Sequence, residues 1–141
     1  MYRHILVATD GSQRSVPAIR QAVALAKSVG ARLTGITVVA PYAPDANAVS
    51  ALSGFPAAAR REAQHALQDF RAEARAQGVR SSVAYLIGGE PWKAILLAAK
   101  ARKCDLIVMG SHGRGGLAGV LLGSEATKVL THAGIPVLIC R

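Results

Sequence analysis

Aromatic side chains and cysteines are scarce in this sequence. Aromatic residues make up 4% of the 141-residue chain, and the two cysteines are Cys104 and Cys140. Proteins that bind single-stranded nucleic acid stack the bases on aromatic side chains, so a nucleic-acid partner of that kind is not expected. Both cysteines lie beside apolar, strand-like segments and fit neither a disulfide framework nor a paired metal motif. We predict that they act as small hydrophobic residues.

Long hydrophobic runs are also missing. The longest apolar stretches, residues 94–99 and 117–122, are interrupted well before the ~20 residues that a membrane-spanning helix needs. The first ten residues contain no basic leader followed by an apolar stretch and a small-residue cleavage site. We therefore expect a cytoplasmic protein with no membrane segment.

Acidic residues are few, and the chain carries an excess of positive charge. Seventeen Lys and Arg residues against eight Asp and Glu give a formal net charge of +9. This charge attracts anionic partners such as polyphosphates, acidic lipids and nucleic acids. The basic residues are, however, scattered from Arg3 to Arg141. A basic surface without any dedicated partner therefore remains an alternative explanation.

The apolar content is high enough for one folded domain, because hydrophobic residues make up 51% of the chain and charged residues 18%. A length of 141 residues is typical of a single domain, which we expect over residues 1–141. Apolar strand patterns alternate with helical ones. Strands are expected at residues 5–8, 32–39, 79–87, 105–109 and 137–140, and helices at 16–29, 59–74, 91–99 and 124–130. Residues 41–56, which show no firm period, are expected to form a flap or functional loop.

This alternation predicts an α/β protein with a parallel sheet, because a parallel connection needs a helical crossover. If the first and fourth strands are neighbours, the strand order is 3-2-1-4-5. Ligands of such sheets bind beyond the carboxyl ends of the strands. The two polar ends to consider are residues 9–12, which read Thr-Asp-Gly-Ser, and residues 110–124.

The second of these ends contains a glycine-rich loop. Residues 110–119 include five glycines, which allow main-chain amides to approach a phosphate closely. Gly123 and Ser124 follow at an expected helix start, where free N–H groups favour an anion. Ser124 could instead merely cap its helix, and the glycines could merely form a turn. The loop lacks the Gly-Lys-Ser/Thr ending of a Walker A motif, and Ala118 breaks the G-x-G-x-x-G pattern.

The spacing Gly110-x2-Gly113-x9-Gly123-Ser124 resembles the ATP-binding signature of the universal stress protein (UspA) family. The resemblance extends through residues 8–12, the Gly-Glu-Pro of residues 89–91, residues 105–110 and residues 136–139. It implies a three-layer α/β/α sandwich of the adenine nucleotide alpha hydrolase-like type, with the order 3-2-1-4-5. It also implies an adenine nucleotide (ATP, AMP or ADP) at the ends of the first and fourth strands. A third implication is a homodimer in which strand 137–140 pairs with its symmetry mate.

The same resemblance assigns roles to individual positions. Asp10 would accept hydrogen bonds from the ribose or adenine, and Val38 would line the adenine. Gly110, Gly113, Gly123 and Ser124 match the phosphate and ribose contacts of the family, and Ser111 and His112 lie between them. On general grounds Asp10 could instead be a helix cap, and Val38 a core residue.

The roles of two further side chains at this end of the sheet, Arg114 and Glu125, stay open at this point. Arg114 could reach a terminal phosphate or could simply be solvated. Glu125 would compete with an anionic ligand unless it points away or helps to hold a divalent ion.

Catalysis receives less support than binding. Phosphoryl transfer needs a positioned nucleophile, a fixed metal and a cation, and the sequence offers one loop arginine and no acid with a base role. The four histidines show no metal spacing, so any Mg²⁺ would be held through the phosphates. The expected function is a nucleotide-dependent regulatory module of the stress response with an unknown protein partner. A slow Mg-dependent ATPase or phosphotransferase is one alternative, and a basic nucleic-acid or protein-interaction module without nucleotide use is the other.

Overall fold

Five parallel strands form the central sheet of the computed structural model, which describes residues 1–40, 55–113 and 121–141. The strands are β1 (His4–Ala8), β2 (Arg32–Val39), β3 (Ser81–Ile87), β4 (Leu106–Gly110) and β5 (Val137–Cys140). Their order in the sheet is β3-β2-β1-β4-β5, and every neighbouring pair is parallel. The predicted α/β class and the order 3-2-1-4-5 are therefore confirmed. Residues 41–54 of the predicted flap (41–56) lie outside the described residues.

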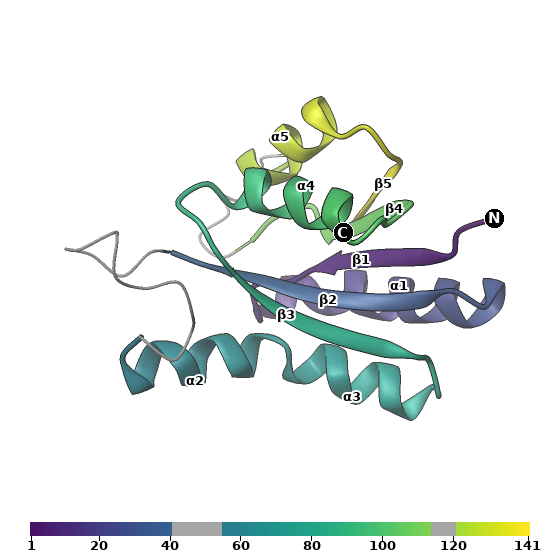
Figure 1. Ribbon diagram of the computed structural model, residues 1–141, viewed down its shortest axis with the longest axis horizontal. Coiled ribbons are helices and arrows are strands. Elements are labelled where there is room, and N and C mark those ends of the chain that lie inside the picture. Colours follow the sequence, from purple (N-terminus) through teal and green to yellow (C-terminus); the bar gives the residue numbers. More distant parts are fainter. Residues whose placement is uncertain (41–54, 114–120) are drawn as a thin grey trace.

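Helices cover both faces of this sheet (Figure 1). Helices α1 (Val16–Val29), α2 (Ala57–Ala66) and α3 (Gln68–Ala76) lie on one face, and α4 (Pro91–Ala101) and α5 (Ser124–His132) on the other. Each face has its own apolar core. Val7, Val23 and Phe70 belong to the first core, and Leu6 and Ile107 to the second. Neighbouring residues of one strand thus face opposite cores, which explains why β1 is apolar at every position after His4.

One expected helix is divided into two. The apolar stripe at residues 59–74 predicts a continuous helix, but α2 ends at Ala66 and α3 begins at Gln68. Leu67 lies between them with φ −98° and ψ 0°, and its side chain is fully buried. The amide of Leu67 donates to the carbonyl of Gln64, three residues back, as in a 3-10 turn. The break lets both helices bury their apolar faces against the same curved layer.

Helix α1 begins at a serine and ends at a glycine. Gly30 ends α1 in the left-handed region with φ 73°. Ser15 stands at the N-cap of α1, yet within the described part of the chain its hydroxyl caps no backbone amide. The hydroxyl instead donates to Asp10 Oδ1 at 2.8 Å. Tertiary structure gives this serine a different partner.

The structure bears on two predictions, one about the cysteines and one about membrane segments. Cys104 and Cys140 are both buried free thiols, and burial raises the pKa of Cys104 to about 11 and also raises the pKa of Cys140. Both thiols therefore stay protonated at neutral pH. Across the described ranges, every helix is too short or too polar to cross a membrane.

A buried polar chain joins three strands at the opposite end of the sheet from the glycine loop. His4 is 7% exposed, and its Nδ1 lies 3.0 Å from the carbonyl oxygen of Arg102. Its Nε2 lies 2.8 Å from Thr34 Oγ1, which in turn lies 3.1 Å from Ser82 Oγ. Because a carbonyl only accepts, Nδ1 carries the proton of the neutral ring and Nε2 accepts from Thr34. The neutral histidine is therefore fully satisfied.

We expect the free energy of unfolding to fall as the pH drops below 6.5. Burial and the nearby charge of Arg32 lower the pKa of His4 below its ordinary value of 6.5. Between those two values the unfolded chain binds more protons than the folded chain, so stability decreases with decreasing pH. Urea titrations between pH 7.5 and 5.5 measure this loss. The His4→Gln variant should lose less over the same range, and an equal loss in both proteins would contradict this assignment.

Candidate functional site

A cleft of about 660 Å³ opens at the carboxyl ends of β1 and β4. The chain leaves β1 toward α1 on one face of the sheet and leaves β4 toward α5 on the other. Successive connections diverge at such a point, which leaves a crevice between them. Volumes of 300–1,000 Å³ are typical of sites for small molecules.

Asp10 occupies the β1 side of the cleft in a fixed orientation. Its Oδ1 accepts hydrogen bonds from the amide of Ser12 at 2.9 Å and from the hydroxyl of Ser15 at 2.8 Å. The backbone turns sharply here because Gly11 has φ 79°, and a Cβ at Gly11 would lie 2.6 Å from Ala66 Cα. A larger residue at position 11 would therefore displace α2. The carboxylate of Asp10 serves this turn and not the cap of a regular helix.

On the β4 side of the cleft, Gly113 lies close to Asp10 and Gly123 lies close to Ser111 because neither glycine has a side chain. A Cβ at Gly113 would lie 2.8 Å from Asp10 Oδ2, and a Cβ at Gly123 would lie 3.0 Å from the carbonyl oxygen of Ser111. The amide of Gly123 donates to that same carbonyl oxygen at 2.6 Å. The two ends of the glycine-rich segment are thus joined through main-chain atoms, and any side chain at these positions would push them apart.

The N-terminus of α5 faces the cleft. Gly123 is the N-cap with φ −68° and ψ 162°, and Ser124 is the first helical residue. Ser124 therefore stands one position inside the cap of its helix. First-turn amides of a helix lack partners within the helix and favour an anion. The hydroxyl of Ser124 lies on the cleft lining beside them.

Glu125 lines the cleft, and its carboxylate has a partner on a neighbouring helix. Its Oε2 accepts a hydrogen bond from the amide of Trp92 at 2.8 Å, in the first turn of α4. The carboxylate therefore partners the N-terminus of α4 while it remains on the cleft lining. This bond also fixes α4 to α5 beside the cleft.

His112 brings a buried ring nitrogen to the cleft. Its Nδ1 lies 3.1 Å from Ser111 Oγ, and its Nε2 is buried without a hydrogen-bond partner in the described structure. A buried polar atom without a partner is costly unless a ligand or solvent satisfies it. Nε2 is thus available to a bound molecule.

An apolar wall completes the cleft on the side of β2 and α4. It includes Val38 and Ile36 of β2, Met109 of β4, and Pro91 and Ile95 of α4. A flat, weakly polar group such as a purine base fits a wall of this kind, because it loses little hydration there. The cleft lining therefore combines polar groups with an apolar surface.

The cleft brings together nearly all the residues that the sequence predicts for the site. The predicted residues on its lining are Asp10, Val38, Gly110, Ser111, His112, Gly113, Gly123 and Ser124. Arg114 lies outside the described residues. Sequence reasoning missed Ser15 and Ile95, which also line the cleft. The spacing of five residues from Asp10 offers no recognisable signal for Ser15, whose contact arises only from the 3-10 turn at Gln13–Ser15.

The chain supplies no obvious metal centre of its own within the described ranges, where no three His, Cys, Asp or Glu side chains gather as a candidate ligand set.

Fold and cleft together define an α/β protein of the adenine nucleotide alpha hydrolase-like fold. The chain belongs to the universal stress protein family, whose profile matches residues 1–141. It is 41% identical over 142 residues to the "universal stress protein in QAH/OAS sulfhydrylase 3′ region" of Thermus aquaticus, with all of both chains covered. It is 33% identical over 149 residues to universal stress protein YxiE of Bacillus subtilis, again over all of both chains.

Solved structures agree with this assignment. The universal stress protein UspA from Lactobacillus plantarum is 28% identical with a TM-score of 0.78, over 99% of this chain and 98% of that one. A universal stress protein solved in complex with cAMP is also 28% identical, with a TM-score of 0.74 over 99% of this chain and 97% of that one. The resemblance noted in the glycine-rich sequence is thus confirmed at the level of the family.

Proposed function

We propose that this protein is an ATP-binding member of the family and acts as a nucleotide-dependent regulatory module of the stress response. The observation that carries the proposal is the geometry of the cleft, in which the glycines of the predicted phosphate motif and the α5 N-terminus face an apolar wall. A related protein, 28% identical, was solved with cAMP, which supports an adenine nucleotide as the ligand.

The parts of the cleft suit the parts of an adenine nucleotide. Main-chain amides near Gly113 and Gly123, together with the hydroxyl of Ser124, suit the phosphates. The fixed carboxylate of Asp10 suits hydroxyl donors of the ribose or the amino group of adenine, and Val38 lies on the wall that suits the base. His112 Nε2 offers a further hydrogen bond. Mg²⁺ would be held through the phosphates.

Regulation requires the nucleotide to favour one conformation over another. A ligand shifts an equilibrium only through its difference in affinity for the two states. Because the Gly123 amide donates to the Ser111 carbonyl beside the cleft, phosphates bound at neighbouring free amides would stabilise this arrangement of the segment. We infer that partner proteins bind this arrangement of the segment.

The cytoplasm remains the expected compartment, because buried, unpaired cysteines are typical of reducing surroundings.

Equilibrium dialysis of the purified protein against ATP tests the binding proposal. We expect saturable retention of ATP at or below millimolar concentration. The Asp10→Asn variant should bind about tenfold more weakly, because a charge-assisted hydrogen bond is worth about 1.5–3 kcal/mol. The matched change Asp69→Asn, on α3, should have no effect. No retention of ATP by the folded protein would rule out the proposal.

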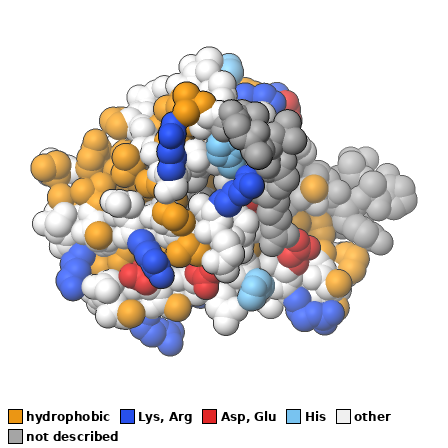
Figure 2. All heavy atoms as spheres, turned by 180° about the vertical axis from the view of Figure 1, so that it is seen from behind, with side chains coloured by type: hydrophobic (Ala, Val, Ile, Leu, Met, Phe, Trp, Pro, Cys, Tyr) orange, Lys and Arg blue, Asp and Glu red, His pale blue; other side chains and the backbone are white. Residues whose placement is uncertain are grey.

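We also propose a homodimer through β5. Val137–Cys140 is the edge strand next to β4, and its outer side has no neighbouring strand in the part of the chain that is described. Leu138 is 38% exposed and Leu130 of α5 is 43% exposed. Figure 2 shows the molecule from behind, so β5 and the N-terminus, on the right in Figure 1, lie on the left there. Hydrophobic side chains gather on that left side of Figure 2. An exposed apolar edge strand is prone to pair with another strand.

Replacing Leu138 by Asp should convert the dimer to monomer. A charge at an apolar strand-to-strand contact would be desolvated without a partner, which weakens association about 100-fold or more. Sedimentation velocity at micromolar concentration measures the change. Leu97→Asp, at a more exposed leucine on α4, provides the control and should leave the dimer intact. A monomeric wild-type protein would contradict the proposal.

A further inference from the structure

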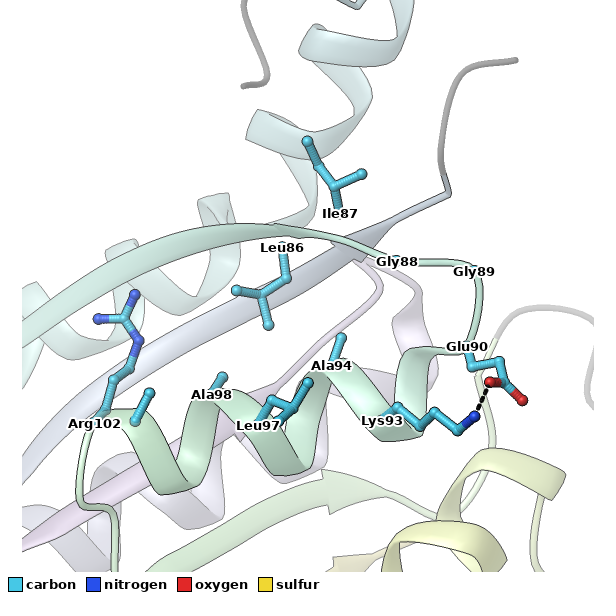
Figure 3. Close-up of a pocket in the computed structure, with 11 residues that line it drawn as sticks. Leu86, Ile87, Gly88, Gly89, Glu90, Lys93, Ala94, Leu97, Ala98 and Arg102 are labelled. Carbon is cyan, nitrogen blue, oxygen red and sulfur yellow. Dashed lines mark ion pairs between the residues drawn. The ribbon is translucent and has the colours of Figure 1, made fainter. Parts of the chain in front are cut away.

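A second hollow of about 510 Å³ lies between β3 and α4, and its lining shares no residue with the cleft. Leu86 of β3 points toward α4 across this hollow, and the facing side of α4 carries Ala94, Leu97, Ala98 and Ala101 (Figure 3). We call it the β3–α4 groove. Leu97 is 69% exposed, which is unusual for so large an apolar side chain.

The sequence of α4 explains why the groove exists. Residues 94, 97, 98 and 101 recur at spacings of three and four and form one stripe along the helix. Ile95 and Ala99 form the neighbouring stripe, which packs in the core with Leu6 and Ile107. Alanine is the residue at three of the four groove positions, and its short side chain leaves space between helix and strand. The helix therefore presents more apolar surface than its core needs.

The two ends of the groove differ in charge. At one end Lys93 forms an ion pair with Glu90, drawn as a dashed line in Figure 3. The hydrogen bond from Lys93 lowers the pKa of Glu90, so this end carries a neutralised pair. At the other end Arg102 extends from the end of α4 toward β3, and among described residues it forms no ion pair (Figure 3). The apolar floor thus ends at a single available cation.

We propose that the β3–α4 groove binds a single-chain carboxylate amphiphile, a free fatty acid with its carboxylate at Arg102 and its acyl chain along Leu86, Ala94 and Leu97. The apolar floor of the groove runs along α4 from Ala94 to Arg102, which is ~12 Å at a rise of about 1.5 Å per residue. A medium-length chain such as dodecanoate spans this distance. The guanidinium of Arg102 pairs well with a carboxylate in a fork-like geometry.

An acyl chain fits the floor better than a peptide does. Between its charged ends the side chains of the groove, from Leu86 to Ala101, offer no hydrogen-bonding atom. A peptide could pair only with the free edge of β3, and over the alanines and leucines of α4 its amide groups would lie against apolar side chains, where unpaired amides are costly. An acyl chain has no such groups.

Isothermal titration calorimetry of the full chain with dodecanoate, below its micellar concentration, tests the proposal. We expect saturable binding of one dodecanoate per chain. Shortening the ligand to decanoate should weaken binding about fivefold, since each fully buried methylene is worth about a factor of four and this groove is partly open. Arg102→Gln should weaken dodecanoate binding about fivefold, as expected for an exposed charge pair. Lys100→Gln removes an equal charge from α4 outside the groove and should change binding less than twofold.

A second variant tests the apolar floor without touching charge. Ala94→Leu fills the narrow part of the groove, where Ala94 Cβ would lie 3.5 Å from a Cβ at Gly88, while leucine remains a good helix former. It should weaken dodecanoate binding more than tenfold with an unchanged unfolding midpoint. Saturating ATP should leave dodecanoate binding unaltered, so the result does not depend on the nucleotide proposal. The proposal is overturned if dodecanoate fails to saturate, if Ala94→Leu binds normally, if Lys100→Gln and Arg102→Gln have equal effects, or if only acidic peptides bind.

Discussion

Replacing Gly123 by Val is expected to lower the affinity for ATP at least 100-fold while the protein remains folded. A Cβ at this position would lie 3.0 Å from the carbonyl oxygen of Ser111 and 3.3 Å from His112 Cα, and the methyl groups of valine extend further. Because Gly123 has φ −68°, a valine is compatible with its backbone, and the effect comes from lack of space. The bond from the Gly123 amide to Ser111 would break and displace the segment that faces the α5 N-terminus.

Gly134→Val is the matched control for this experiment. A Cβ at Gly134 meets nothing within 4 Å, so the same side chain can be added at the other end of α5 without contact. ATP affinity measured by dialysis should be unchanged in this variant, and urea titration of both variants should show cooperative unfolding. A hundredfold loss corresponds to about 2.7 kcal/mol of binding free energy. Equal ATP affinity in Gly123→Val and the wild type would show that the ligand lies elsewhere.

Gly35→Ala should lower the free energy of unfolding by about 3 kcal/mol, at the upper end of the usual cost of overpacking. Gly35 lies within β2, where a Cβ would come within 2.4 Å of the Phe70 ring. Phe70 is fully buried, so its ring has little room to move. Since native proteins are stable by only about 5–15 kcal/mol, this single methyl group would remove a large share of the total.

A double-mutant cycle separates this clash from a general intolerance of the strand. Phe70→Ala alone should cost about 3–5 kcal/mol, because it leaves a cavity. In that background Gly35→Ala should cost about 2 kcal/mol less than it does alone, within the usual coupling of residues in contact. Gly89→Ala, where a Cβ meets nothing within 4 Å, should change stability by less than ~1 kcal/mol. Additive losses in the double variant would show that Phe70 is not the obstacle.

The first strand was predicted reliably because a central strand of a covered parallel sheet is apolar on both faces. Leu6 and Val7 face different cores, so their run of adjacent apolar residues signals a buried strand and not a helix. The helical stripe at residues 59–74 was a weaker predictor, since the same spacing fits one helix or two. Only the packing of Leu67 in the core decides that the helix breaks there.

Residues of the cleft show the same division. The strand ends and the glycine-rich loop indicate residues 9–12 and 110–124, and the resemblance to the universal stress protein family singles out Asp10, Gly113 and Gly123 among them. The bond from Ser15 to Asp10 and the bond from Glu125 to the Trp92 amide could not be predicted. Each depends on a side-chain orientation that is set by elements distant in sequence or by an unexpected turn.

The sequence by itself determined the α/β alternation and the positions of the glycines at the strand ends, because local periodicity and residue type reveal both. The strand order needed more than local periodicity, since it followed only if the first and fourth strands were neighbours or from the resemblance to the family. Tertiary structure alone decided the partner of Glu125, the break at Leu67 and the groove beside Arg102. These depend on how two helices or a helix and a strand meet, and many packings are compatible with one apolar stripe.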